Sequence, residues 1–362
     1  MIRAYPETGI ERDRWILDRR GARNPLDPCK PHAFLIEEER AASGEVVSIA
    51  TIFLTNRECP WRCLMCDLWK NTLTDTVPLG AIPTQMDYAL SRLNGPGSAS
   101  NQPEPGQERE GMETAHQIQQ IKLYNSGSFF DPRAIPPADH EAIAWRVAAF
   151  ERVIVECHPA LVGKSVLKFR DLLRDGRGPG HAPTAGLEVA MGLETAHPEI
   201  LAKLNKRMTL DQFRRAADFL RVNNIALRVF VLVQPPFLDN SEALPWARRS
   251  IDFAFDCGAS VVSLIPTRSG NGALDVLAGL GEFRPPSLAT LEAALDYGIT
   301  VKRGRVFADL WDLEKFSDCP ACLDPRRSRL KEMNLQQVVL PRVVCGRCES
   351  QAPARNHPAG SR

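Results

Sequence analysis

The sequence predicts an α/β fold whose core is a largely parallel sheet, and three observations lead to this prediction. Segments with strand-like and helical patterns alternate six times between residues 46 and 266. The first, residues 46–54, is a nearly continuous β-branched apolar run, as in a strand buried on both faces. A loop with three closely spaced cysteines follows it directly. Parallel neighbours need crossover connections, usually helices, so the sheet is either a barrel, complete or partial, or open and doubly wound.

Each expected element rests on apolar periodicity and on the residues that bound it. Proline ends two of the strands, Pro235 the fifth and Pro266 the sixth, because proline cannot continue a hydrogen-bonded ladder. The expected strands span residues 46–54, 118–124, 153–157, 187–193, 225–233 and 260–265. The expected helices span residues 79–93, 139–150, 161–173, 198–204, 210–222 and 242–255.

Composition divides the chain into a core and flanking segments. Residues 1–45 are expected to form an N-terminal cover, and residues 46–270 the core domain. Within the core, residues 95–111 are polar and rich in Gly, Pro and Ser, which predicts a flexible surface insertion. Residues 271–350 form a C-terminal region, and residues 351–362 are expected to be a disordered tail.

The overall composition is that of an ordinary soluble globular protein, with 44% hydrophobic and 25% charged residues. The net charge of +1 gives no global sign of a nucleic-acid partner, so such a partner would need a local basic patch. No run of about 18 apolar residues exists, and acidic residues interrupt the N-terminus. A cytoplasmic protein without a membrane partner is therefore expected. Its ten cysteines are expected to be metal ligands or buried thiols instead of disulfides.

The loop after the first strand carries Cys59, Cys63 and Cys66 in a C-x3-C-x2-C spacing. Three soft thiolate ligands on one short loop suit an iron-sulfur cluster. Electron-transfer clusters are normally held by four cysteines, so a cubane held by three leaves one iron free to bind a substrate or cofactor. A structural zinc loop, or cysteines scattered in the core, are the alternatives.

With Trp61 and Met65 beside the cysteines, this loop resembles the signature of the radical S-adenosylmethionine (SAM) superfamily. The resemblance implies a partial (βα)6 barrel in which the open iron of a 4Fe-4S cluster binds SAM. An electron from the cluster then cleaves SAM to a 5′-deoxyadenosyl radical. The resemblance also implies an electron donor such as flavodoxin or ferredoxin, and it favours the barrel over the open sheet.

Polar residues follow several expected strands, at the edge where the active site of such a sheet forms. Asn125, Ser126 and Gly127 follow the second strand and resemble the family's Gly-containing turn, whose backbone receives the amino group of SAM. A plain Asn-Ser-Gly turn is the alternative. Glu156 ends the third strand, where the family often places a ligand of the ribose hydroxyls. A buried Glu156 needs a partner, because an unpaired buried carboxylate is costly.

The fourth strand ends in Glu194, and Asn205 and Lys206 precede a helix capped by Thr209. The Gly-Leu-Glu-Thr and Asn-Lys motifs resemble the Elongator-like branch of the superfamily, which makes Glu194 and Lys206 candidates for contacts with SAM or substrate. Ordinary pairing of two surface ions is the alternative. Four histidines lack metal-like spacing, are expected at the surface or in loops, and are assigned no catalytic role: His140, His158, His181 and His197.

Two C-x2-C pairs, Cys319 with Cys322 and Cys345 with Cys348, have a separation near that of zinc ribbons. Four thiolates satisfy tetrahedral zinc, so a closed zinc site in a zinc-ribbon-like module is expected, with a second iron-sulfur cluster as the alternative. The basic residues between the pairs are expected either to hold tRNA phosphates on a loop or to form a solvated face. These residues are Arg326, Arg327, Arg329, Lys331 and Arg342.

The barrel, the Elongator-like motifs and the C-terminal cysteine module together resemble the archaeosine-forming radical SAM proteins and their bacterial relatives. The archaeal family releases a lysine-derived side chain from a modified 7-deazaguanine in tRNA, so the resemblance implies a radical SAM enzyme of tRNA modification, either a lyase or a transferase. Two alternatives remain. One is a radical SAM enzyme acting on a small metabolite or peptide, and the other is a non-enzymatic iron-sulfur or zinc protein that binds nucleic acid.

Overall fold

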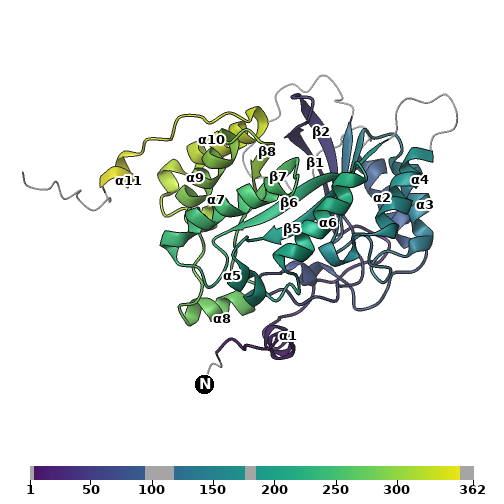
Figure 1. The fold of residues 1–362 in the computed structure, drawn as a ribbon, viewed down its shortest axis with the longest axis horizontal. Coiled ribbons are helices and arrows are strands. Elements are labelled where there is room, and N and C mark those ends of the chain that lie inside the picture. Colours follow the sequence, from purple (N-terminus) through teal and green to yellow (C-terminus); the bar gives the residue numbers. More distant parts are fainter. Residues whose placement is uncertain (1–3, 94–117, 176–184, 351–362) are drawn as a thin grey trace, which may run out of the picture.

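Eight strands form one sheet whose spatial order is their order in the chain (Figure 1). The computed structural model describes residues 4–93, 118–175 and 185–350. Strand β1 is antiparallel to β2, and every later strand is parallel to its predecessor. The strands are β1 (Ala33–Arg40), β2 (Val46–Phe53), β3 (Gln120–Tyr124), β4 (Arg152–Glu156), β5 (Gly186–Glu194), β6 (Ala226–Val233), β7 (Val261–Pro266) and β8 (Arg305–Ala308).

The six strands expected from the sequence are present as β2 to β7, with ends shifted by a few residues. The edge strands β1 and β8 were not expected from the sequence. Half of β1 is charged, and pairing with β2, not apolar periodicity, makes it a strand. Strand β8 has four residues, too few for a recognisable pattern. The expected insertion at 95–111 and the tail at 351–362 lie outside the described residues.

Helices cover the outer face of the sheet, as crossover connections require. Figure 1 shows α6 and α7 in front of β5 and β6, with α2, α3 and α4 grouped beside one another. The helices between strands are α2 (Ala81–Leu93), α3 (His140–Val147), α4 (Lys164–Asp175), α5 (Pro198–Lys203), α6 (Leu210–Val222), α7 (Asn240–Asp256), α8 (Ala273–Gly279) and α9 (Leu288–Thr300). The flanking helices are α1 (Gly9–Leu17), α10 (Pro320–Gln336) and α11 (Gly346–Ser350).

The sheet curls strongly enough for side chains of distant strands to meet across its concave face. Arg228 on β6 donates two hydrogen bonds to Glu39 on β1, at 2.5 and 3.1 Å, although four strands separate β1 from β6. The edge strands β1 and β8 do not pair, but Arg305 on β8 donates to the carbonyl oxygen of Arg40 on β1 at 2.8 Å. Helix α10 contacts both edge strands. The fold is therefore a partial barrel whose opening is covered by α10.

The apolar core lies between the sheet and its helices. Outward-facing strand residues such as Ile52, Ile121 and Val153 are fully buried against it. Among the described helices, none is long and apolar enough to cross a bilayer.

Candidate functional site

The three-cysteine loop leaves the sheet at the carboxyl end of β2 and is held in place by side-chain amides. Asn205 donates to the carbonyl oxygen of Arg62 at 2.8 Å, and Asn271 donates to that of Leu64 at 2.8 Å. The Leu64 N–H in turn bonds the carbonyl oxygen of Leu204 at 2.9 Å. Asn271 had no signal in the sequence, because its role depends on a contact between residues 207 positions apart.

Glu58, next to the first cysteine, joins the loop to the N-terminal segment. It pairs with Arg20 at 2.7 Å, with Arg62 at 2.9 Å, and with Arg23. Burial disfavours the ionised carboxylate, but the hydrogen bonds from Arg20 and Arg23 prevail and hold the pKa of Glu58 below its ordinary value. Helix α1 packs its Trp15 near the loop in the same small core. The N-terminal segment thus packs against the cysteine loop.

The thiols of Cys59, Cys63 and Cys66 lie in a desolvated environment. Burial raises the pKa of all three thiols above the ordinary value, that of Cys63 to about 12. Within the described part of the chain, their sulfur atoms do not all gather within 4.8 Å of one another, whereas those of the C-terminal set do. One metal ion would require such an approach. A cubane does not, because each thiolate binds a different iron.

The turn after β3 meets both Glu156 and the cysteine loop. The Asn125 N–H donates to Glu156 Oε2 at 2.8 Å. Burial raises the pKa of Glu156 to about 7, although backbone N–H groups of the turn, from Asn125 to Gly127, act in the opposite direction. A Cβ at Gly127 would lie 2.9 Å from Cys59 Cβ, so the turn packs directly on the loop. The partner expected for Glu156 is therefore this turn.

Several buried polar atoms at the ends of β2 and β3 have no partner among the described residues. Both amide atoms of Asn125 are unpaired, as are Thr55 Oγ1 and Asn56 Oδ1, and all three residues have no exposed surface. Unpaired buried polar groups are rare and costly in folded proteins. Their concentration beside three thiols fits a site that holds a polar cofactor.

Glu194 and Lys206 form a buried ion pair, with Lys206 Nζ 2.5 Å from Glu194 Oε1. Burial disfavours the ammonium ion, but the neighbouring Glu194 and Cys63 raise the pKa of Lys206 above its ordinary value. Glu194 has φ +67° and follows a register shift at Gly192, where a Cβ would lie 2.1 Å from Glu194 Oε1. The alternative of a surface ion pair is wrong, because both residues are buried.

His140 is buried on α3, which corrects the expectation that it lies at the surface or in a loop, whereas His158 lies in the loop after β4, as expected, but is also buried. The His158 ring stacks on Trp61 of the cysteine loop, with centroids 3.7 Å apart, and its Nε2 lies 3.0 Å from the carbonyl oxygen of Lys206. Burial lowers the pKa of His158 to about 3 and that of His140, which stacks on Phe129, to about 4. His158 thus supports the site as a neutral ring, which its sequence spacing could not indicate.

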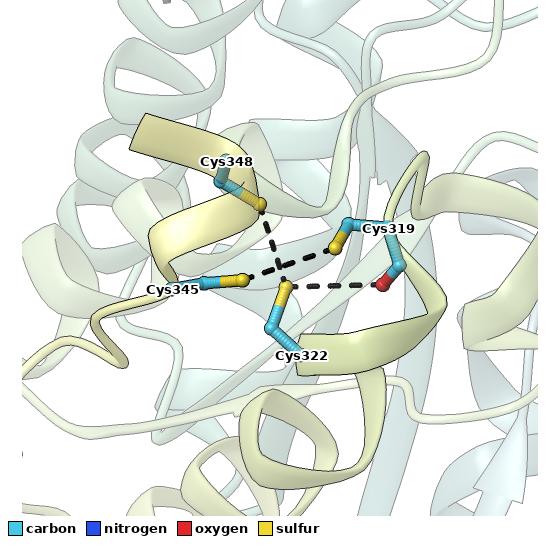
Figure 2. A group of neighbouring side chains, drawn as sticks. All are labelled: Cys319, Cys322, Cys345 and Cys348. Carbon is cyan, nitrogen blue, oxygen red and sulfur yellow. Dashed lines mark hydrogen bonds between the residues drawn. The ribbon is translucent and has the colours of Figure 1, made fainter. Parts of the chain in front are cut away.

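The C-terminal cysteines come together in a second, separate group (Figure 2). The sulfur atoms of Cys319 and Cys345 are 3.9 Å apart, and those of Cys322 and Cys348 are 3.7 Å apart. The first pair lies at the start of α10 and the second at α11, so the thiols converge from two helices instead of the β-hairpins of a ribbon. Pro320 at the first helical position favours a helix start directly after Cys319.

The basic stretch between these pairs is largely helix α10, which corrects the expectation of a loop. Arg329 is buried and pairs with Asp296 at 2.7 Å, and Arg326 pairs with Glu292 at 2.7 Å. Arg327 pairs with Asp324 at 2.8 Å. These guanidinium groups attach α10 to α9 and to its own first turns, so they are already neutralised.

Comparison with known proteins gives sequence relatives but no matching family model. An uncharacterized protein of Methanocaldococcus jannaschii is 23% identical over 279 residues, which cover 74% of this chain and 68% of that protein. The archaeosine synthase subunit beta of Methanosarcina acetivorans is 28% identical over 174 residues, 46% of this chain and 47% of that subunit. That of Thermococcus kodakarensis is 26% identical over 136 residues. The chain resembles archaeosine synthase beta subunits. This agrees with the resemblance stated from the motifs.

The match spans about half or less of these two beta subunits. Parts of two solved structures are similar to this fold. The match with methylornithine synthase covers 75% of this chain and 68% of the synthase chain, with 13% identity and a TM-score of 0.46. The match with Elp3 of Methanocaldococcus infernus covers 61% of this chain and 56% of the Elp3 chain, with 12% identity and a TM-score of 0.45. At these values the structural likeness adds nothing to an assignment of activity.

Proposed function

We propose that the chain is a radical SAM enzyme that acts on a 7-deazaguanine-type nucleoside in tRNA. The observation that carries the proposal is the meeting of two features at one edge of the parallel sheet. The three-thiol loop after β2 packs on the turn after β3, and unpaired buried polar atoms surround their junction. A cluster held by three thiolates has an open iron, and a polar cofactor beside it would satisfy the orphaned groups.

The donor set assigns the residues that would hold each group. Cys59, Cys63 and Cys66 would bind a 4Fe-4S cluster, which together with SAM supplies a carbon-centred radical for hydrogen abstraction. Asn125 and Glu156 would bind the polar groups of SAM, the first through its unpaired amide and the second through a carboxyl oxygen. With its pKa raised to about 7, Glu156 can donate or accept a hydrogen bond near neutral pH, which suits a pair of ribose hydroxyls.

The other polar residues of the site, the Glu194–Lys206 ion pair and His158, add no net charge to it. The Glu194–Lys206 pair lies over Gly192 and beside Cys63, so its ammonium ion stabilises negative charge on the thiolates while Glu194 keeps the pair neutral overall. Stacking of His158 on Trp61 and the cover formed by α1 limit the access of water to the loop. Exclusion of water protects a reactive radical from side reactions.

The substrate part of the proposal is supported by the archaeosine synthase relatives and by the Elongator-like motifs around Glu194 and Lys206. A cytoplasmic location and an electron donor such as flavodoxin or ferredoxin belong to the same proposal. Arg326 and Arg329 of α10 are paired with acids of α9, which leaves fewer unpaired cations on this helix for tRNA phosphates. The rival substrates remain a small metabolite or peptide, and the rival function is nucleic-acid binding without catalysis.

Anaerobically reconstituted protein should form 5′-deoxyadenosine from SAM in the presence of dithionite, and the Cys63→Ala variant should not. Equal rates from both proteins would refute the radical SAM assignment, and a fully loaded cluster without SAM cleavage would favour the non-enzymatic alternative. Mass spectrometry of nucleosides from the tRNA and DNA of a deletion strain tests the substrate. No change in any modified nucleoside would favour the small-molecule alternative.

The C-terminal cysteines are proposed to hold one zinc ion. Around an ion with Zn–S bonds of about 2.3 Å, the sulfur atoms of a tetrahedron lie about 3.8 Å apart. The two sulfur pairs, 3.7 and 3.9 Å apart, have this spacing. Thiolates that bind different irons of a cluster would lie farther apart, so the distances favour zinc over a second iron-sulfur cluster. Metal analysis should find one zinc per chain in addition to cluster iron, and Cys345→Ser should lose the zinc but keep the iron. Loss of iron equivalent to a second cluster would contradict the proposal.

A further inference from the structure

Three aromatic side chains lie together on the concave face of the sheet: Phe53 on β2, Tyr124 on β3 and Phe230 on β6. The Tyr124 ring centroid is 6.1 Å from that of Phe53 and 6.1 Å from that of Phe230. Two strands separate β3 from β6, so the second contact crosses the concave face. All three side chains are half-buried, while most of the surrounding strand residues are fully buried.

These rings adjoin the residues assigned to SAM. Tyr124 directly precedes the turn that begins at Asn125, and Phe230 pairs in the sheet with Gly192, under the Glu194–Lys206 ion pair. Residues opposite each other in a parallel sheet point to the same face. The rings therefore lie on the side of the sheet where a substrate would face the cofactor.

The charges next to the rings are already paired. The cations that act electrostatically on Tyr124 are Lys122 and Arg228. Lys122 is bound by Glu37 at 2.9 Å and by Glu39 at 2.7 Å, and Arg228 by Glu39 and Glu188. An anionic substrate group at this depth would find both of these cations already paired with carboxylates of the described residues, and its desolvation would go uncompensated.

The Tyr124 hydroxyl, by contrast, has no hydrogen bond to any residue that the structure describes. Burial raises the pKa of Tyr124 to about 12, so the hydroxyl stays protonated and can donate. A tyrosine in such a place combines an apolar ring with one polar atom that needs a partner. A flat ring with a polar edge meets both requirements.

We infer that Tyr124 is a specificity-determining residue that contacts an uncharged planar heterocycle of the substrate. Its hydroxyl bonds a polar atom at the edge of that heterocycle, and Phe53 and Phe230 pack on its faces or rim. The inference rests on the proposed function for the position of SAM and adds the residue that selects the substrate. An amino acid or peptide with its own charges is disfavoured at this place.

The test measures, by titration calorimetry, the affinity for 7-deazaguanosine of the cluster-loaded, SAM-bound wild type and of its variants. Loss of one hydrogen bond in Tyr124→Phe should weaken binding about three- to tenfold. Phe230→Leu should weaken it by at least a similar factor. Tyr88→Phe is the matched control, because Tyr88 is a half-buried tyrosine on α2 whose ring contacts Phe34 and Arg92 away from the concave face. Its affinity should equal that of the wild type.

Two results would overturn the inference: equal affinities of the wild type and Tyr124→Phe, or no binding of the nucleoside by the wild type. Binding of free lysine in preference to 7-deazaguanosine would also overturn it. Tyr124→Phe and Phe230→Leu should take up as much cluster iron on reconstitution as the wild type, which shows that both variants fold, and the dithionite-reduced wild type should cleave SAM without nucleoside. Absence of that cleavage from the wild type would count against the proposed function instead, so the two failures are distinguishable.

Discussion

Replacement of Arg228 by methionine tests whether the ion network on the concave face holds the curled sheet together. Arg228 is 2% exposed and donates to Glu188 at 2.7 Å and to Glu39 at 2.5 and 3.1 Å. Arg228→Met preserves much of the side-chain volume but leaves Glu188 and Glu39 with fewer partners. Removing one member of a buried ion pair costs about 3–5 kcal/mol of unfolding free energy, because the remaining charge is uncompensated.

The loss of unfolding free energy in Arg228→Met should become smaller as the pH falls. Although burial opposes ionisation, Arg228 and Lys122 hold the pKa of Glu39 well below its ordinary value of 4.5. In the wild type, Glu39 therefore contributes stability above about pH 4.5, and this contribution is lost as pH falls through its lower folded-state pKa. In Arg228→Met, protonation relieves the unpaired carboxylates. The difference between the two proteins should accordingly be largest near pH 7 and shrink toward pH 5.

Urea denaturation at several pH values measures this difference. Arg146→Met is the matched control, because Arg146 also binds a carboxylate through two nitrogens, at 2.8 Å each to Asp87, but on the surface. Its loss should cost less than about 1 kcal/mol at every pH. An Arg228→Met deficit as small as that of the control, or one that does not change with pH, would refute the network's role in closing the sheet.

Three further predictions concern the site. Gly127→Ala should reduce the iron content after reconstitution, because its Cβ would lie 2.9 Å from Cys59 Cβ, whereas Gly163→Ala, with no atom within 4 Å of the new Cβ, should retain it. Since burial raises the folded-state pKa of Glu156 to about 7 from 4.5, its contribution makes wild-type stability fall as pH rises between these values. Glu156→Gln should remove that part of the slope, and an unchanged slope in denaturation curves would contradict the pKa. Lys206→Met should destabilise the fold by about 3–5 kcal/mol through the stranded Glu194, and the double variant with Glu194→Gln should recover part of this loss.

Local patterns in the sequence were enough to predict the scaffold. The apolar runs at β2 to β7 and the helices between them follow from periodicity, and the parallel direction of these strands follows from the need for crossovers, whereas the barrel-like order was expected only from the family resemblance. The edge strand β1 was missed because its glutamates resemble a surface segment, yet Glu39 is buried against Arg228. The basic stretch near Arg329 was likewise expected in a loop. The sequence does not show that acids of α9 lie beside it and neutralise Arg329.

The sequence by itself determined that three thiols follow the first parallel strand, since their spacing is local and the loop is short. It also indicated polar strand ends at Asn125, Glu156 and Glu194. Only the tertiary structure decided which of these groups meet: Glu156 binds the turn after β3, and Glu194 binds Lys206. The curl of the sheet brings Arg228 to Glu39, 189 positions away, and Phe230 to Tyr124. Such contacts depend on the curvature of the whole sheet, which no short stretch of sequence encodes.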